Sequence, residues 1–413
     1  EYKNVYRPAR VISYDKESGE LMLHNYMDFD DLKDYVKISY ELTQDGLVIS
    51  KGKLPEVSVA PHSEGKTNLK INVPESGKCY LKFIYHLKKE LPLLDEDHIL
   101  GFDEIEVSKE DTKCKLAEKW IPKTVVDSEL QVNENDTQIH IKGREFAYTI
   151  DKRTALFTEM KFAGREYLNH PMELNIWRAP TDNDMYIKSE WKKAHYDKAY
   201  TRAYTTEVVQ GKHGVKITSH ASVVAETVQK ILDVMITWKI EAAGKIDADI
   251  EVTKDDEFPD LPRFGVRMFL DKKLSAARYF GMGPQESYCD KHQAASHGLY
   301  QANVDDLHED YIRPQENGSH YDCEYVELNN SRYGIVVSAE NAFSFNASYY
   351  TQEELEKKTH NYELTESDSV VFCVDYALNG IGSNSCGPVV LEQYRFDDVL
   401  FRFQFTLIPY VKG

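Results

Sequence analysis

The sequence contains no long apolar run, which argues against a membrane protein. A bilayer-spanning helix needs about 18 or more consecutive apolar residues, and no such stretch occurs among the 413 residues. The first ten residues, EYKNVYRPAR, also lack the apolar core of a signal peptide. The chain begins with Glu1 rather than methionine, which favours a fragment or a processed form. We therefore expect a soluble protein, cytoplasmic or periplasmic, with no membrane partner.

The sequence also lacks the motifs of zinc sites and disulfide frameworks. Its six cysteines form no CxxC pair, and no histidines stand at zinc-finger spacing. We expect free thiols, no metal site and no other cofactor in this chain. Basic residues are outnumbered, with 50 Lys and Arg against 69 Asp and Glu, a formal net charge of −19. Because such an acidic surface repels phosphate backbones, nucleic acid is not an expected partner.

Helical periodicity is scarce, and strand periodicity is abundant. Apolar residues alternate with polar ones in VKISYEL (36–42), DVMITWKIEA (233–242) and LFRFQFTLIP (400–409), which places each apolar set on one face of a strand. Aromatic residues make up 12% of the chain, and these favour strands. The best helical candidate is SEWKKAHYDKA (189–199), in which Trp191, Ala194, His195 and Lys198 share a face. The sequence predicts an all-β protein with one or two short helices.

Turn-forming segments divide the chain into two predicted domains. Residues 1–108 contain short strands separated by turns such as KESGE, TQDG and PESGK, which is typical of an immunoglobulin-like β-sandwich. Residues 109–130 are charged, lack sustained alternation and are predicted to be a linker. Residues 131–413 continue the strand pattern without a fixed repeat, so we expect one large sandwich rather than a propeller.

Several short motifs fail as catalytic or binding signatures. GMGP at 281–284 has no third glycine and no following helix, so it is a turn rather than a nucleotide-binding loop. The triplet Asp182-Asn183-Asp184 offers oxygen ligands, but the glycine and distal glutamate of an EF-hand are absent. No GxSxG elbow occurs, which disfavours acyl transfer. Carboxylates such as Glu286, Glu316 and Asp375 are expected to be solvated or turn-forming.

Five segments in colinear order resemble the C-terminal region of bacterial β-galactosidases of glycoside hydrolase family 2. They are WRAPTDNDM (177–185), FGMGPQESY (280–288), RPQENG (313–318), FNASYYTQEELEKKTHNYEL (345–364) and GIGSNSCGP (380–388). The front segment VYRPARVISYDKESGELMLHNYMDFDDL (5–32) is similar to the immunoglobulin-like domain that follows the catalytic barrel in those enzymes. The resemblance covers almost the whole chain. Several separate segments in one order are far more specific than any single motif.

The resemblance implies that this chain does not carry the catalytic machinery. In the family, a (β/α)8 barrel holds the two glutamates of a retaining glycosidase, and its acid/base motif, an Asn-Glu pair in a Gly- and His-containing loop, has no counterpart here. The family's magnesium and sodium sites lie mainly in that barrel. The last domain is a supersandwich of the galactose-mutarotase type. We expect these 413 residues to support the barrel, to complete the rim of its galactoside pocket and to be inactive alone.

The segment WRAPTDNDM is predicted to be a loop after a strand. Pro180 cannot donate to a sheet ladder and biases the residue before it toward extended geometry. Asp182, Asn183 and Asp184 are expected to hold the loop through side-chain to backbone bonds. Arg178 is expected to form an ion pair inside the loop. By resemblance, this loop lies near the mouth of the barrel's active site and moves with ligand.

Cys386 is the candidate substrate-binding residue, again by resemblance. In relatives of the family a tryptophan at the matching place stacks on the sugar of the leaving-group site, whereas this chain has Ser385-Cys386-Gly387-Pro388. A thiol offers no aromatic platform, so acceptor binding is expected to be weaker or supplied by another group. The alternative is that Cys386 only packs, as free cysteines commonly do.

Two other functions stay open at this point. An aldose epimerase of related fold would use histidine and glutamate on a concave face, and the chain offers His292, His297, His308, His320 and Glu316. A stand-alone carbohydrate-binding module would need exposed aromatic platforms, for which Trp177, Trp191, Trp238 and many of the tyrosines are candidates, although the pattern places Trp191 and Trp238 in the core. Self-association into a homo-oligomer through apolar patches is compatible with either.

Overall fold

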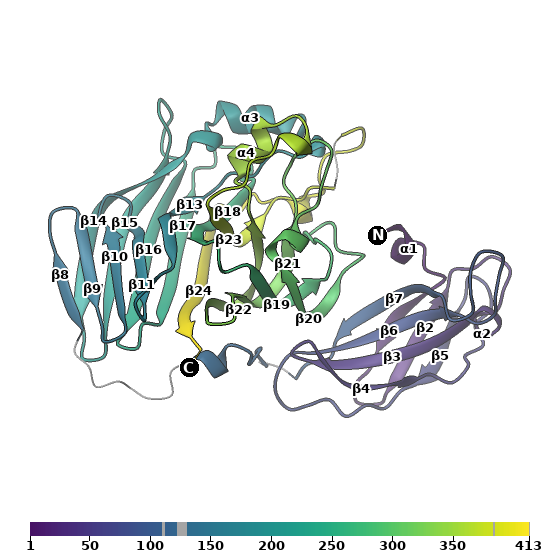
Figure 1. The fold of residues 1–413 in the computed structure, drawn as a ribbon. Coiled ribbons are helices and arrows are strands. Elements are labelled where there is room, and N and C mark those ends of the chain that lie inside the picture. Colours follow the sequence, from purple (N-terminus) through teal and green to yellow (C-terminus); the bar gives the residue numbers. More distant parts are fainter. Residues whose placement is uncertain (110–111, 122–129, 383–384, 413) are drawn as a thin grey trace. The chain divides into compact units, whose positions relative to one another are not determined.

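The computed structural model describes residues 1–109, 112–121, 130–382 and 385–412. It confirms the all-β class, with short helices between the strands (Figure 1). Two compact units are present, the first comprising residues 1–115 and 292–299 and the second residues 116–291 and 300–413. Of the predicted linker 109–130, residues 110–111 and 122–129 lie outside the described residues, and Glu118–Trp120 form the 3-10 helix η1. The helices in the described part of the chain are all too short or too polar to cross a membrane.

The first unit is a sandwich of two antiparallel sheets, as predicted (Figure 1). One sheet has the order β1-β2-β5 and the other β4-β3-β6-β7, with short helices α1 and α2 beside them. The bounds are α1 Tyr2–Val5, β1 Ala9–Tyr14, β2 Glu20–Asn25, α2 Leu32–Tyr35, β3 Val36–Gln44, β4 Leu47–Lys53, β5 Glu64–Asn68, β6 Cys79–Leu87 and β7 Ile99–Glu106. Leu21 and Leu23 of one sheet and Phe83 of the other are buried in one shared core.

The second unit packs a five-stranded sheet, β12-β11-β10-β9-β8, against a twelve-stranded sheet (Figure 1). The path of the large sheet is β13-β18-β23-β22-β24-β17-β16-β15-β14, with β19, β20 and β21 attached through β22. The bounds are β8 Gln131–Glu134, β9 Gln138–Lys142, β10 Phe146–Asp151, β11 Leu156–Phe162, β12 Arg165–Glu166, β13 Leu168–Asn175, β14 Tyr200–Gln210, β15 Gly214–Val224, β16 Leu232–Glu241, β17 Ile246–Lys254, β18 Arg263–Asp271, β19 Ala276–Gly283, β20 Ser296–Asn303, β21 His320–Asn329, β22 Tyr333–Ser348, β23 Ser369–Leu378 and β24 Leu400–Val411.

The core of the second unit follows the alternation of the sequence. Trp238 on β16 is fully buried, its ring lies edge-on to Phe157 with centroids 4.9 Å apart, and its indole N–H donates to the Ala155 carbonyl at 2.8 Å. Phe401, Phe403 and the other inward residues of β24 are buried as the period predicts. The small sheet therefore covers one face of the large one through aromatic contacts.

The predicted helix over 189–199 is wrong in its bounds. The helix α3 runs Ile187–Lys193, and a separate 3-10 helix η3 covers Tyr196–Lys198. His195 between them has a φ of 59°, a left-handed conformation that ends an α-helix. Trp191 is nevertheless buried, as expected. The described residues form more short helices than the one or two predicted. Besides η1, the others in this unit are α4 Gln352–Lys357, η2 Asp182–Asp184, η4 Val304–Leu307, η5 Asn361–Glu363 and η6 Glu392–Tyr394.

Candidate functional site

Four loops of the second unit meet where strands of the large sheet end. They are residues 177–185 after β13, 286–290 after β19, 313–318 before β21 and 379–382 after β23. We call these four loops the motif junction. The first loop leaves the sheet because β13 ends at Asn175, whose side-chain oxygen accepts the Trp177 backbone N–H at 3.0 Å, before Pro180. Loops far apart in sequence are thus brought together by strand pairing.

Arg178 ties the first loop to the fourth. Its guanidinium forms a buried ion pair with Asp184, with Nη2 2.6 Å from Oδ1 and Nε 3.1 Å from Oδ2. The side chains are 0% and 5% exposed. The same guanidinium donates to the backbone carbonyls of Asn379 and Gly380. The predicted ion pair inside the loop is confirmed, and the structure adds its bonds to the neighbouring loop.

Asp182, Asn183 and Asp184 hold the first loop in three different ways. Asp184 Oδ2 accepts the backbone N–H of Thr181 at 2.8 Å, and the Asn183 amide donates to the Ile381 carbonyl at 2.6 Å. Asp182 instead faces the third loop, where its backbone N–H donates to the side-chain oxygen of Gln315 at 3.1 Å. The predicted movement of this loop with ligand stays a prediction.

Asp290 holds the fourth loop from its other side. Its carboxylate accepts the backbone N–H of Ile381 at 3.0 Å and that of Gly382 at 2.8 Å. A Cβ atom added at Gly380 would lie 2.7 Å from Asp290 Oδ2, so a larger residue there would displace the Asp290 carboxylate. Donors from the first loop bind the carbonyls of 379–381, while Asp290 binds the amides of 381–382. The backbone of this loop is therefore fixed on both sides.

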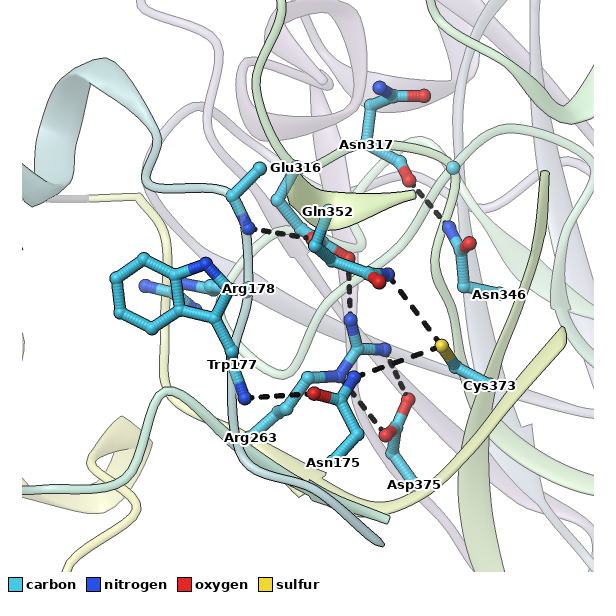
Figure 2. Close-up of polar contacts among 12 residues, drawn as sticks. Asn175, Trp177, Arg178, Arg263, Glu316, Asn317, Asn346, Gln352, Cys373 and Asp375 are labelled. Atoms are coloured by element: carbon cyan, nitrogen blue, oxygen red, sulfur yellow. Dashed lines mark hydrogen bonds and ion pairs between the residues drawn. The ribbon is translucent and has the colours of Figure 1, made fainter. Parts of the chain in front are cut away.

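A second buried ion pair lies beneath the junction (Figure 2). Arg263 on β18 contacts Asp375 on β23, with Nη2 2.5 Å from Oδ2, and Glu316 of the third loop, with Nη1 2.9 Å from Oε1. The other oxygen of Glu316 accepts the Ala179 backbone N–H at 3.2 Å. Burial opposes the charge on Arg263, but these carboxylates outweigh it and hold the pKa of the guanidinium above its usual range. Glu316 and Asp375 were expected to be solvated or turn-forming. Neither is solvated, because each is buried against Arg263.

Glu286 was also expected to be solvated or turn-forming, and it too is not solvated. It is buried, and its oxygens accept bonds from Lys291 Nζ at 2.5 Å, Tyr311 OH at 2.5 Å and the Gly318 backbone N–H at 2.9 Å. Burial raises the pKa of Glu286, but the bonds from Lys291 and Tyr311 outweigh it and lower that pKa. Glu286 thus links the second loop to the third as a charged acceptor.

Cys386 lies on the exposed stretch that follows the fourth loop. Residues 383–384 beside it lie outside the described residues. Its predicted contact with a sugar stays a prediction. Met185, at the end of the first loop, is 42% exposed, and Tyr186, directly after it, is 61% exposed.

The buried carboxylates in and beneath the junction are paired with cations, and these carboxylates are Asp184, Glu286, Glu316 and Asp375. In the described part of the chain, no cluster of three or more His, Cys, Asp or Glu side chains is placed to hold a metal. Sequence reasoning missed the Arg263 network, since its members are separated by 53 and 112 positions. The sequence signal that could have indicated this network is Arg263, a charged residue within the largely apolar run of β18.

The residues considered for the other two functions are mostly packed inside. His320 is buried between the rings of Tyr279 and Phe345, at centroid distances of 4.4 and 5.1 Å, and burial lowers its pKa to about 4. Trp177, Trp191 and Trp238 are 3%, 0% and 0% exposed, so none offers a ring to a sugar. The tryptophan platforms considered for a carbohydrate-binding module are therefore absent.

Comparison with known proteins agrees with this architecture. Residues 21–108 match the family model of β-galactosidase domain 4, and residues 142–407 match that of the β-galactosidase small chain. Fold and matches together define the class, an all-β region of a glycosidase. More particularly, the chain belongs to the β-galactosidase small chain family.

The relatives are much longer than this chain. A β-galactosidase from Actinobacillus pleuropneumoniae is 43% identical over 411 residues, covering 99% of this chain and 39% of the relative. One from Staphylococcus xylosus is 30% identical over 412 residues, covering 98% and 40%. The chain spans about two fifths of the length of these relatives.

Among solved structures, a galactose 1-epimerase from Lactobacillus acidophilus is 8% identical with a TM-score of 0.39, covering 70% of this chain and 100% of that one. An aldose epimerase homologue from C. elegans is also 8% identical, with a TM-score of 0.33 and coverage of 69% and 99%. Likeness at this level says nothing about activity.

Proposed function

We propose that this chain is the non-catalytic C-terminal part of a retaining β-galactosidase. It supports a catalytic barrel of the same polypeptide and completes the rim of the galactoside pocket. The supporting observation is the motif junction itself. Segments that carry the resemblance, from 177 to 382, meet in one hydrogen-bonded cluster whose base is buried and whose tips face solvent. A fixed base with exposed tips suits a surface that adds to another domain's pocket.

The chain's own carboxylates support a scaffold role. Hydrolysis with retention requires two carboxyl groups about 5 to 5.5 Å apart, one of them free to act as an acid. The buried carboxylates Asp184, Glu286, Glu316 and Asp375 are each bonded to arginine or lysine, so their oxygens are occupied by contacts within the chain. No cofactor is assigned to this chain, and any magnesium or sodium requirement is proposed to belong to the barrel.

Complementation tests this proposal. The purified chain is assayed with nitrophenyl β-galactoside, alone and mixed with the separately expressed preceding region of the Actinobacillus pleuropneumoniae enzyme, which is 43% identical over the shared part. We expect no hydrolysis by either piece and hydrolysis by the mixture. Turnover by the chain alone that survives repeated purification would overturn the proposal.

Cys386 is proposed to contact the acceptor sugar at this rim. The full-length Cys386→Trp variant would regain an aromatic platform for stacking. We expect tighter acceptor inhibition by glucose and a larger share of transfer product over hydrolysis. An unchanged product ratio and unchanged inhibition would show that Cys386 lies away from the sugar.

A further inference from the structure

A cleft of about 300 Å³ opens on the second unit beside the start of β21, an internal part of β22 and the end of β23. None of the junction's buried ion pairs lines it. Three half-buried tyrosines contribute to its walls, together with two aspartates and one arginine. We call this set the tyrosine cleft: Tyr321, Tyr376, Tyr394, Asp322, Asp398 and Arg395.

Two strands that both pair with β22 depart from regular pairing to line this cleft. In β21 the register with β22 shifts between His320 and Cys323, and Asp322 has a φ of 53°. In β23 a bulge lies at Tyr376. Asp375 pairs with Gly265 of β18 and Ala377 pairs with the adjacent Phe264, so no residue of β18 is left to pair with Tyr376. Bulges re-aim side chains, and a left-handed non-glycine residue costs free energy that the surrounding fold must offset. Both irregular residues line the cleft.

The lining favours a neutral, hydroxyl-rich ligand. Tyr376 is held by stacking on Phe401, with ring centroids 4.8 Å apart at 16°. Burial raises the pKa of Tyr321 to about 12, so its hydroxyl stays protonated at neutral pH. Asp322 and Asp398 supply carboxylates that accept hydroxyl hydrogens, while Arg395 is the one cation among the lining residues. An excess of carboxylates disfavours phosphate and other anions.

We propose that the tyrosine cleft binds one ring of a neutral saccharide, at a site additional to the galactoside pocket of the proposed function. The volume lies at the low end of the range for small-molecule pockets, which fits a single sugar ring and not an oligosaccharide. Tyrosine rings pack on the apolar face of a sugar, and the carboxylates accept its hydroxyls.

We test this site by titrating the intact 413-residue chain with methyl β-galactoside and methyl β-glucoside. Binding is followed by saturation-transfer NMR. We expect dissociation constants of about 1 to 10 mM, typical of a weak single-ring site. Tyr376→Ala and Asp322→Asn should each weaken binding at least about fivefold. Asparagine tolerates the left-handed backbone at 322, so this variant removes the charge at a position whose backbone it can adopt. Tyr362→Ala, at a side chain 79% exposed and outside the cleft, is the matched control.

Three results would overturn the site. They are no saccharide binding at all, binding that both cleft variants leave unchanged, and binding that Tyr186→Ala, directly after the first loop of the motif junction, abolishes instead. Inorganic phosphate and spermidine are titrated in parallel, and preference for either would assign the cleft to an ion. Because this experiment uses the chain alone, its outcome is independent of the complementation assay.

Discussion

Two fully buried arginines hold the motif junction, and each is matched by more than one acceptor. Arg178 has Asp184 and two backbone carbonyls, while Arg263 has Asp375 and Glu316. Taking a charge out of water is costly, so such a residue persists only where its donors are satisfied. The buried arginines therefore make the loop positions mutually dependent.

Asp375→Ala is expected to lower the free energy of unfolding of the second unit by about 3–5 kcal/mol, because it leaves the Arg263 charge buried with one partner fewer. Urea unfolding followed by circular dichroism measures this. The control is Glu366→Ala, which breaks the exposed ion pair with Lys272 and should change stability by no more than about 1 kcal/mol. Equal effects of the two variants would contradict the prediction.

His320 predicts a specific pH dependence of stability. Burial lowers its pKa from 6.5 to about 4, so between these values the unfolded chain binds a proton that the folded chain does not. The neutral, buried His320 therefore adds to the free energy of unfolding in full above pH 6.5, and this stabilisation is lost as the pH falls toward 4. Relative to His320→Phe, the wild-type chain should lose about 3 kcal/mol across that window. Parallel stability-against-pH curves for the two proteins would show that His320 does not titrate this way.

At the scale of elements, the backbone segment 379–382 is held by donors on one side and by Asp290 on the other. Asp290→Ala should speed hydrogen exchange at the Ile381 and Gly382 amides by about 10- to 100-fold, as the loss of bonds worth about 1–3 kcal/mol implies. Mass spectrometry of peptides covering these residues measures the rates.

Asp15→Ala is the matched control for Asp290→Ala. Asp15 also accepts two backbone N–H groups, those of Glu17 and Ser18 at 2.9 and 2.8 Å, but in a turn of the first unit. The Asp15→Ala variant should speed amide hydrogen exchange only in the turn that contains residue 15. If Asp290→Ala left the 381–382 amides as protected as before, Asp290 would not hold this loop.

At the scale of the whole molecule, the two units have separate cores. Phe83 belongs to the core of the first and Trp238 to that of the second. We expect two unfolding transitions in denaturant. Phe83→Ala should shift only one and Trp238→Ala only the other, each by about 3–5 kcal/mol. Calorimetry with intrinsic fluorescence distinguishes them. A single transition moved equally by both variants would mean that the units unfold together.

The sequence by itself determined the all-β class, the inward faces of strands such as β16 and β24, and the exit of the chain after β13. These features depend on neighbours a few positions apart, where the two-residue period and the restricted geometry of proline act directly. The same local reasoning gave the ion pair of Arg178 with a carboxylate of its own loop. Local reasoning did not predict that the helix ends before His195, because no nearby sequence feature indicates a left-handed residue there.

Only the tertiary structure decided which carboxylates are buried and what they bind. Glu316 and Asp375 look like ordinary surface residues until β18, β23 and the third loop bring Arg263 to both. The tyrosine cleft likewise depends on irregular pairing of β21 and β23, which no periodicity records. The physical reason is that burial of a charge is favourable only with its partner present, and the partner's position is set by strand pairing across many residues.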